Sequence, residues 1–260
     1  MKKILFIVLL ATQVLFSQSK DEVLIPKETI PLVADVFYGY DILGNYYYTK
    51  SNVLYKKTKT QLFQYQDVAF GKITKIDTYN PLMLLVFYEN FNTVVLLDSQ
   101  LNEIKTIDFN KLETPVLASA VAISSQDEIY FYDLLTLKIG LLNVYSLKNH
   151  LISNVLESNP KQYTSNYTHF IWKNQEGNVY AINRYGVVNK LCQVNCSNTY
   201  INNYYDILCL DGSKITGFDT TGKNTQNWVV ENYLPENLCL KNGILSIFTK
   251  NKIVNFITQK

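Results

Sequence analysis

Leu82–Phe109, with the sequence LMLLVFYENFNTVVLLDSQLNEIKTIDF, is the most hydrophobic meander expected in the chain. It predicts three β-strands in a row, because it is rich in Leu, Val, Ile, Phe and Tyr and is interrupted by two polar links of four residues. The expected strands are Leu82–Tyr88, Thr93–Asp98 and Glu103–Phe109, joined by Glu89–Asn92 and Ser99–Asn102. A meander with two apolar faces is not stable alone, so we expect it to stack against similar units elsewhere in the chain.

The composition is that of a folded β-protein. The chain has 260 residues, 47% of them hydrophobic, which is enough to build a large core and excludes wholesale disorder. This length allows one large all-β domain or two small ones. Tyrosine is abundant (20 residues) and favours strands whose hydroxyl groups reach water at the edge of a sheet.

The charge balance argues against a nucleic-acid partner. Lys and Arg number 24 against 22 Asp and Glu, and the chain without Lys2 and Lys3 is neutral. Arg184 is the only arginine. Nucleic-acid binding depends on clustered positive charge and on arginine forks, so we expect no nucleic-acid binding.

The N-terminus predicts export. Residues 1–19 match a signal peptide: Lys2 and Lys3 precede the short apolar run Ile4–Phe16, and small residues follow at Ser17-Gln18-Ser19. A buried first strand or helix is the alternative. No cysteine follows the apolar run, so we expect no lipid anchor. No later stretch approaches twenty apolar residues without polar interruption, so we expect no integral membrane protein. The expected location is the bacterial periplasm, with an extracellular location as the other option.

A repeated unit runs through the rest of the chain. The third strand of a unit tends to end at Asp or Asn before a polar turn, at Asp98, Asn143, Asn183 and Asp219, in steps of about 45, 40 and 36 residues. Turns between second and third strands are expected at Glu176-Gly177-Asn178, Asp211-Gly212-Ser213 and Lys241-Asn242-Gly243. The segments CLDGSKITGFDTTGK and CLKNGILSIFTKNK align as an internal repeat and place Cys209 and Cys239 in matching second strands.

The first residues of the mature chain fall outside this pattern. Lys20–Pro31 is expected to be an extended lead-in, in which Val23–Ile25 can pair with the edge of a sheet.

The repeated units begin at Val36, and we assign residues 20–260 to one all-β domain. The predicted fold is a β-propeller of about six four-stranded blades, with five or seven blades also compatible. Two β-sandwich domains are the alternative.

The repeat rhythm resembles that of secreted β-propellers of the NHL or YncE-like class, and more loosely the periplasmic propeller of the outer-membrane assembly machinery. The resemblance covers most of the mature chain and implies a propeller fold. It does not extend to the regular Trp-Asp of WD repeats or the glycine pair of Kelch repeats, which are both missing.

The four cysteines allow disulfides in an exported protein. Cys192 and Cys196 are four residues apart, and a local bridge between them is the expected pairing. Cys209 and Cys239 are expected to be buried thiols, because matching positions on adjacent blades are too far apart for a bridge. The two histidines, His150 and His169, are not spaced to complete a metal site.

Catalytic signatures are missing from the sequence. It contains no GxSxG nucleophile elbow and no glycine-rich phosphate loop. Asp41, Asp77 and Asp206 end strands, where aspartate usually forms a turn, although carboxylates of different blades can also converge. The sequence therefore favours a non-enzymatic protein without a cofactor and leaves enzymatic activity open.

Tyrosine with Asn or Asp recurs at the corners between inner and second strands. If the units are blades, these corners lie on one face around a central channel and suit contact with a protein or glycan. The expected binding residues are Tyr38, Tyr40, Tyr79, Asn80, Tyr167, Tyr204, Tyr205 and Tyr233. Alternatively, each tyrosine only covers its own corner.

The sequence thus predicts a non-enzymatic interaction module of the bacterial envelope, with a protein or peptide as its partner. A carbohydrate-binding or carbohydrate-active propeller is the second hypothesis. A redox or metal-dependent enzyme is the third, and the shortage of histidine and of clustered cysteine counts against it.

Overall fold

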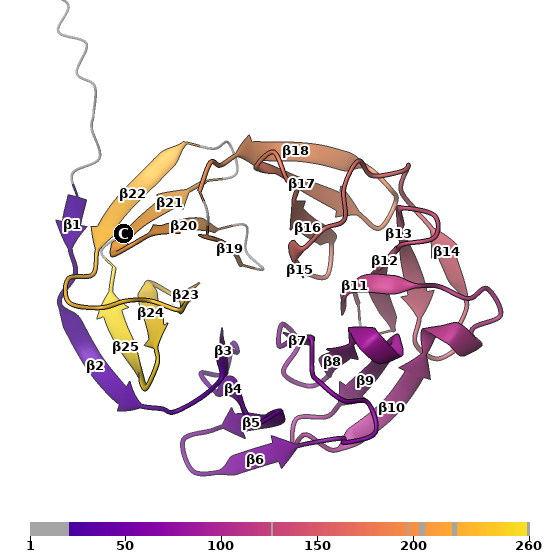
Figure 1. Cartoon of the computed structure of the whole chain (residues 1–260), viewed down its shortest axis with the longest axis horizontal. Helices are drawn as coiled ribbons and strands as arrows, with labels where there is room; N and C mark the ends of the chain where they lie inside the picture. Colours follow the sequence, from indigo (N-terminus) through magenta and orange to yellow (C-terminus); the bar gives the residue numbers. More distant parts are fainter. Residues whose placement is uncertain (1–20, 126, 197, 203–205, 220–222, 259–260) are drawn as a thin grey trace, which may run out of the picture.

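The chain folds as a six-bladed β-propeller, as predicted, and the two-sandwich alternative is wrong. A computed structural model describes residues 21–125, 127–196, 198–202, 206–219 and 223–258. Within these ranges six separate sheets stand around a central axis, and the four strands of each blade are antiparallel (Figure 1). The signal peptide predicted at residues 1–19 lies outside the described residues.

Blade 2 contains the predicted meander. From the axis outward its strands are β7 (Lys75–Asp77), β8 (Leu84–Tyr88), β9 (Thr93–Leu97) and β10 (Glu103–Asp108). Every residue of β8 and β9 is buried, because the neighbouring blades cover both faces of the sheet. Leu85 packs toward blade 3 and Val86 toward blade 1. The alternation of side chains along one strand therefore supplies the core of two blade interfaces.

The other blades repeat this order from the axis outward. Blade 1 consists of β3 (Val36–Tyr40), β4 (Tyr46–Lys50), β5 (Val53–Lys57) and β6 (Leu62–Tyr65). Blade 3 consists of β11 (Ala118–Ile123), β12 (Glu128–Asp133), β13 (Lys138–Asn143) and β14 (Asn149–Leu151). Blade 4 consists of β15 (Gln162–Ser165), β16 (His169–Lys173), β17 (Asn178–Asn183) and β18 (Val188–Gln193). Blade 5 consists of β19 (Asn198–Ile201), β20 (Ile207–Asp211), β21 (Lys214–Phe218) and β22 (Asn224–Val229).

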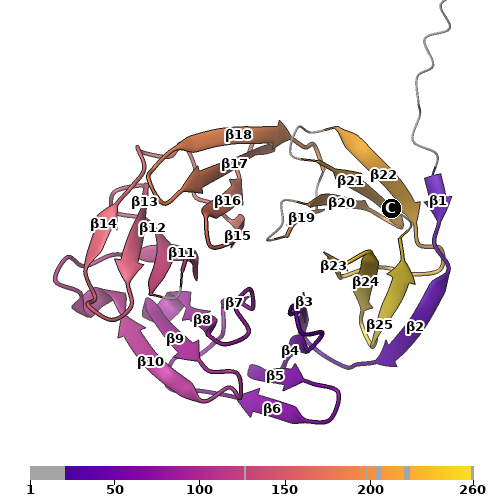
Figure 2. The ribbon, with the colours of Figure 1, turned by 180° about the vertical axis from the view of Figure 1, so that it is seen from behind.

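Blade 6 joins the two ends of the chain. Its inner three strands are β23 (Asn237–Lys241), β24 (Ile244–Thr249) and β25 (Lys252–Ile257), and its outermost strand is β2 (Pro26–Pro31). Ile30 of β2 lies opposite Ile253 of β25. β1 (Asp21–Val23) adds a parallel fifth strand outside β22 of blade 5, which confirms the predicted edge pairing of Val23 (Figure 2).

The role of β2 in closing the ring was not predicted. Its sequence PKETIP begins and ends with proline and reads as a lead-in. Proline is tolerated here because β2 is the outermost strand of its sheet, where one row of backbone groups needs no partner.

The predicted alignment of blades 5 and 6 is wrong by one strand. Cys209 lies in β20, the second strand of blade 5, whereas Cys239 lies in β23, the innermost strand of blade 6. The turn at Asn242-Gly243 therefore joins the inner and second strands, and not the second and third. The two segments align because each is a hairpin with a tight turn of positive φ, at Gly212 and at Asn242-Gly243. The sequence of a hairpin does not show which two strands of the blade it forms.

The ring has two ends with different loops. Adjacent strands of a blade are antiparallel, so its turns alternate between the ends. One end carries the turns between inner and second strands, whose described residues are 41–45, 78–83, 124–125 and 127, 166–168, 202 and 206, and 242–243; we call it the inner-turn face. The opposite end carries the connections between blades; we call it the connection face.

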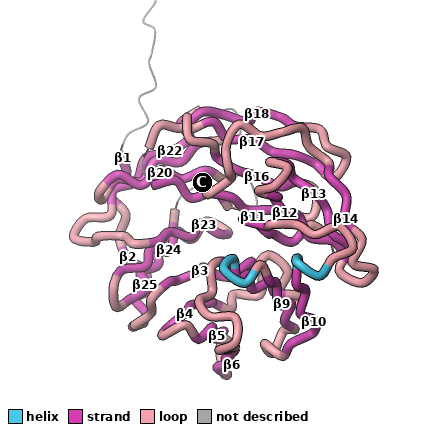
Figure 3. The backbone as a smooth tube through the Cα atoms, turned by 45° about the vertical axis from the view of Figure 1, so that its right-hand side comes forward, coloured by secondary structure: helices cyan, strands magenta, loops and turns pink. Residues whose placement is uncertain are grey.

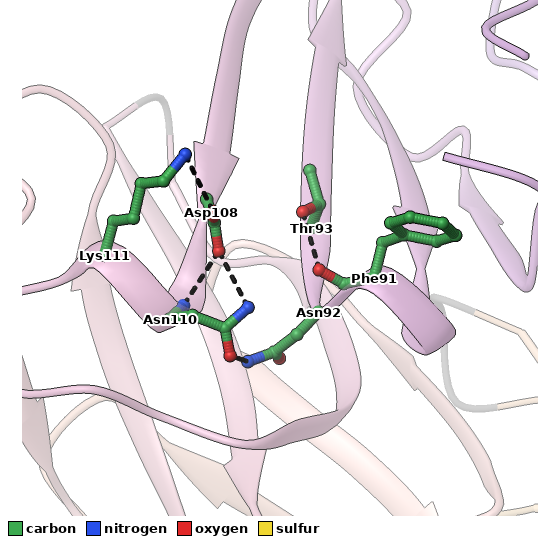
Figure 4. A network of polar contacts seen from close by, with 6 residues as sticks. All are labelled: Phe91, Asn92, Thr93, Asp108, Asn110 and Lys111. Carbon is green, nitrogen blue, oxygen red and sulfur yellow. Dashed lines mark hydrogen bonds and ion pairs between the residues drawn. The ribbon is translucent and has the colours of Figure 1, made fainter. Parts of the chain in front are cut away.

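Two short helical turns lie on the outer part of the connection face, η1 (Glu89–Phe91) and η2 (Phe109–Lys111) (Figure 3). Asn92 follows η1 and ties blade 2 to blade 3: its Nδ2 donates to the Val116 carbonyl (2.6 Å), and its Oδ1 accepts from the Ala118 N–H (2.9 Å). Asn92 Nδ2 also contacts Asn110, whose own N–H groups donate to Asp108 (Figure 4). No helix in the described part of the chain is long and apolar enough to cross a membrane.

Candidate functional site

A cavity of about 400 Å³ occupies the centre of the ring. Its walls come mainly from the innermost strands β3, β7, β15, β19 and β23. The aromatic part of the wall consists of Tyr38, Tyr40, Tyr163 and Tyr200. Burial raises the pKa of each of these four phenols, so all remain neutral near pH 7.

Lys75 of blade 2 reaches across the cavity wall to blade 4. Its Nζ donates to the backbone carbonyl of Tyr163 (3.2 Å) and lies 4.8 Å from the centre of the Tyr163 ring. Burial lowers the pKa of Lys75, and the nearby Asp77 opposes this shift. Blade 3 lies between blades 2 and 4 in the ring, so a contact between Lys75 and Tyr163 requires the inner strands of these three blades to lie close together.

Asp77, two residues further along β7, joins the same three blades. Its carboxylate accepts from the Tyr79 N–H (2.9 Å) and from the Ile123 N–H (3.0 Å), and it contacts the Ser165 hydroxyl (3.3 Å). Burial raises the pKa of Asp77, although these hydrogen bonds and Lys75 oppose the shift. The contact with Tyr79 confirms the prediction that Asp77 forms a turn.

The three strand-end aspartates hold separate turns and do not converge. The Asp41 carboxylate accepts from the Asn45 N–H (2.9 Å) and the Tyr47 hydroxyl (2.8 Å) in blade 1. Asp206 exchanges hydrogen bonds with Asn202 in blade 5. Among the described residues that line the cavity, Asp77 is the one carboxylate. The described lining therefore lacks the carboxylate pair on which glycoside hydrolysis usually depends.

Tyr79 and Tyr167 meet on the inner-turn face. Their ring centroids are 4.8 Å apart, and the rings are tilted by 65° in an edge-to-face arrangement. Tyr79 belongs to blade 2 and Tyr167 to blade 4, so the pair bridges the inner end of blade 3. Asn166 fixes the turn that carries Tyr167, because its Oδ1 accepts from the Thr168 and His169 N–H groups (both 2.9 Å). Two of the predicted tyrosines thus form one aromatic surface.

The other predicted residues occupy different places. Asn80 is buried, and its Oδ1 accepts from the Leu82 N–H (3.0 Å), so it shapes the turn. Tyr38 and Tyr40 lie on β3 and line the cavity, and the Tyr40 hydroxyl lies 3.4 Å from Asn255 Nδ2. Tyr204 and Tyr205 lie outside the described residues.

The position predicted for Tyr233 is wrong. Tyr233 lies between β22 and β23, in a connection between blades, and therefore on the connection face. Its ring packs edge-on against Phe256, with centroids 5.8 Å apart, and Lys252 Nζ lies 5.1 Å from its centre. The misplacement follows from the one-strand error in aligning blade 6.

Sequence reasoning missed three exposed aliphatic residues on the inner-turn face. Ile42, Leu43 and Leu82 are 60%, 66% and 69% exposed, and Tyr167 is 43% exposed. All four lie in turns between inner and second strands, so the inner-turn face presents large apolar side chains to solvent. Apolar residues inside a run of turn-forming residues, as in Asp41-Ile42-Leu43-Gly44-Asn45, could have indicated these exposed positions.

The predicted Cys192–Cys196 bridge is not formed. The disulfide joins Cys196 to Cys209, so the prediction of a free thiol is wrong for Cys209 and confirmed for Cys239. Cys192 stays a buried thiol because its position in β18, opposite Val179, turns it into the core between blades 4 and 5. Cys196 follows the end of β18 and meets β20 of the next blade. No group of three His, Cys, Asp or Glu suited to a metal occurs in the described ranges.

No protein-family model and no curated protein matches the sequence. Solved structures share the fold: a streptogramin B lyase structure has 14% identity and a TM-score of 0.58, covering 90% of this chain and 88% of that one. A catalytically inactive virginiamycin B lyase from Staphylococcus aureus with quinupristin has 11% identity and a TM-score of 0.59, covering 89% and 99%. The WD40 β-propeller domain of Doa1 has 12% identity and a TM-score of 0.56, covering 83% and 75%. At these identities the similarity establishes the propeller fold alone.

Proposed function

We propose that this six-bladed propeller is an exported, non-enzymatic module of the bacterial cell envelope that binds a partner protein through its inner-turn face. The observation that carries the proposal is the Tyr79–Tyr167 pair, with Ile42, Leu43 and Leu82 exposed in turns of the same face. Exposed apolar groups that share a face with an aromatic pair are typical of protein-binding surfaces.

Side-chain hydrogen bonds also hold three turns of this face. Asp41, Asp77 and Asn166 each accept backbone hydrogen bonds inside the turns that carry the exposed residues. A preorganised surface loses little conformational entropy on binding, which favours affinity. The near-neutral net charge of the chain agrees with recognition through apolar and hydrogen-bonded contacts rather than charge steering.

Two independent features support export. The first 19 residues have the pattern of a signal peptide. The Cys196–Cys209 disulfide fits an oxidising compartment such as the periplasm or the exterior of the cell.

The test is affinity capture from envelope extract with two matched variants. The Leu82→Ser/Tyr167→Ser variant removes apolar surface from the inner-turn face. Leu234→Ser removes a side chain that is 82% exposed on the connection face and serves as the control. We expect the wild type and Leu234→Ser to retain the same protein, and the double variant to bind it at least about tenfold more weakly.

Two outcomes would overturn the proposal. One is a protein partner that the double variant retains at full strength. The other is no protein partner together with a thermal shift from an oligosaccharide, which would favour a carbohydrate-binding propeller that stacks sugar on Tyr167.

A further inference from the structure

The central cavity carries an excess of positive charge. Three lysines line it, at Lys75, Lys161 and Lys241, and Asp77 is the one acidic side chain among the described lining residues. None of the three lysines forms an ion pair with a carboxylate of the described residues. A protein cavity with low-dielectric walls concentrates such a field, so small anions are drawn into it.

Lys75 has N–H donors that can bind a ligand. An ammonium group has three N–H donors, and Lys75 uses one of them on the Tyr163 carbonyl. The face of the Tyr163 ring provides a further weak contact. Removing an ammonium group from water is costly unless an opposite charge or several acceptors compensate for it. An anion beside Lys75 would supply that compensation.

Asp77 does not fill this role. Its two oxygens accept from the backbone N–H groups of Tyr79 and Ile123, and Ser165 lies beside one of them. Asp77 influences Lys75 only through space, because the pair is beyond ion-pair distance. The Asp77 carboxylate is therefore occupied by groups of blades 2, 3 and 4, and Lys75, which also lines the cavity, keeps N–H donors for a ligand.

The other two lysines lie at opposite mouths of the cavity. Inner strands run from the connection face to the inner-turn face, so Lys161, which precedes β15, lies at the first mouth and Lys241, which ends β23, lies at the second. Lys161 is exposed, and Lys241 Nζ donates to the Tyr40 carbonyl (3.1 Å). The cavity therefore has a lysine near each mouth in addition to Lys75.

The residues that line the cavity indicate the size and polarity of the ligand. The cavity of about 400 Å³ lies within the range of small-molecule sites. Tyr38 and Tyr200 contribute aromatic residues to the lining, and Ile201 and Leu238 contribute aliphatic ones. We propose that the cavity is a binding site for a small organic carboxylate with an aromatic or aliphatic body, whose carboxylate contacts Lys75. This site is separate from the protein-binding face.

The test compares phenylacetate with its neutral isostere phenylacetamide by isothermal titration calorimetry on the whole chain. We expect phenylacetate to bind with a Kd of about 1 mM or lower, and the amide at least about tenfold more weakly. Lys75→Met is expected to weaken phenylacetate binding by at least about tenfold, and Lys241→Gln by a smaller factor. Lys190→Gln, on the outer strand β18, is the control and should bind like the wild type.

The comparison of two ligands on the wild type keeps the test valid even if Lys75→Met fails to fold. Equal affinity for phenylacetate and phenylacetamide would overturn the proposal. Undetectable phenylacetate binding at about 10 mM, or equal effects of Lys75→Met and Lys190→Gln, would overturn it as well. The Leu82→Ser/Tyr167→Ser variant should bind phenylacetate normally, so failure of this proposal and failure of the proposed protein-binding function are distinguishable.

Discussion

The ring of Tyr79 meets the ring of Tyr167 edge to face, with 4.8 Å between centroids, although one residue belongs to blade 2 and the other to blade 4. Such aromatic pairs contribute about 0.5–1.5 kcal/mol beyond the burial of their area. We therefore predict that Tyr79→Ala and Tyr167→Ala are coupled by about 1 kcal/mol in a double-mutant cycle of urea unfolding. Additive effects of the two substitutions would show that the rings contribute independently to stability.

Closure of the ring by β2 predicts a strong dependence on the N-terminal strand. A chain that begins at Leu32 lacks β1 and β2 and leaves the edge of β25 unpaired along five residue pairs. We expect it to lose about 3 kcal/mol or more of unfolding free energy, because each lost ladder hydrogen bond contributes about 1 kcal/mol. A chain that begins at Leu24 lacks β1 alone and should lose much less. Equal urea midpoints for the two truncations would contradict closure by β2.

The Cys196–Cys209 disulfide predicts a redox-dependent stability. Its two cysteines are 13 residues apart, and closing a loop of this length stabilises a protein by about 3 kcal/mol in the chain-entropy account. Cys196→Ser should lower the unfolding free energy by about that amount, and Cys192→Ser should remove no crosslink. Peptide mapping of the non-reduced protein should find Cys196 joined to Cys209, whereas a Cys192–Cys196 peptide would contradict the structure.

The buried carboxyl of Asp77 predicts a pH-dependent contribution to stability. Burial raises its folded-state pKa above the ordinary value of 3.8, so the folded protein holds this proton more tightly than the unfolded chain does. The stabilising contribution is therefore complete below pH 3.8 and is lost as the pH rises through the folded-state pKa. The difference in unfolding free energy between the wild type and Asp77→Asn should shift against the wild type as the pH rises through this window. A difference that stays constant from about pH 4 to pH 8 would contradict the raised pKa.

The fold was predictable because each blade repeats local signals. The apolar strands of Leu82–Phe109 and the polar turns at Asp98 and Asn183 report strand length and hairpin position, and both are short-range properties. The place of a strand within its blade is a long-range property. Pro26–Pro31 pairs with a strand at the far end of the chain, and Cys239 lies one strand further in than its alignment with Cys209 suggested. Neither position can be recognised from the residues around it in the sequence.

The candidate site was only partly predictable for the same reason. Tyr79 and Tyr167 were recognised at the inner-turn corners, but their contact depends on how three blades meet around the axis. The sequence around Lys75 does not mark it as a site residue, because a lysine at the start of a strand is usually solvated. Its position over the Tyr163 ring arises only when the inner strands of blades 2 and 4 come together.

Site-specific photo-crosslinking tests whether a partner protein binds through the inner-turn face. A photoreactive phenylalanine analogue replaces Leu82 on that face, or Leu234 on the connection face, in the protein expressed in its native envelope. We predict that the probe at Leu82 forms a discrete crosslinked product with one partner protein and that the probe at Leu234 does not. Crosslinking to a partner from position 234 and not from position 82 would contradict binding through the inner-turn face.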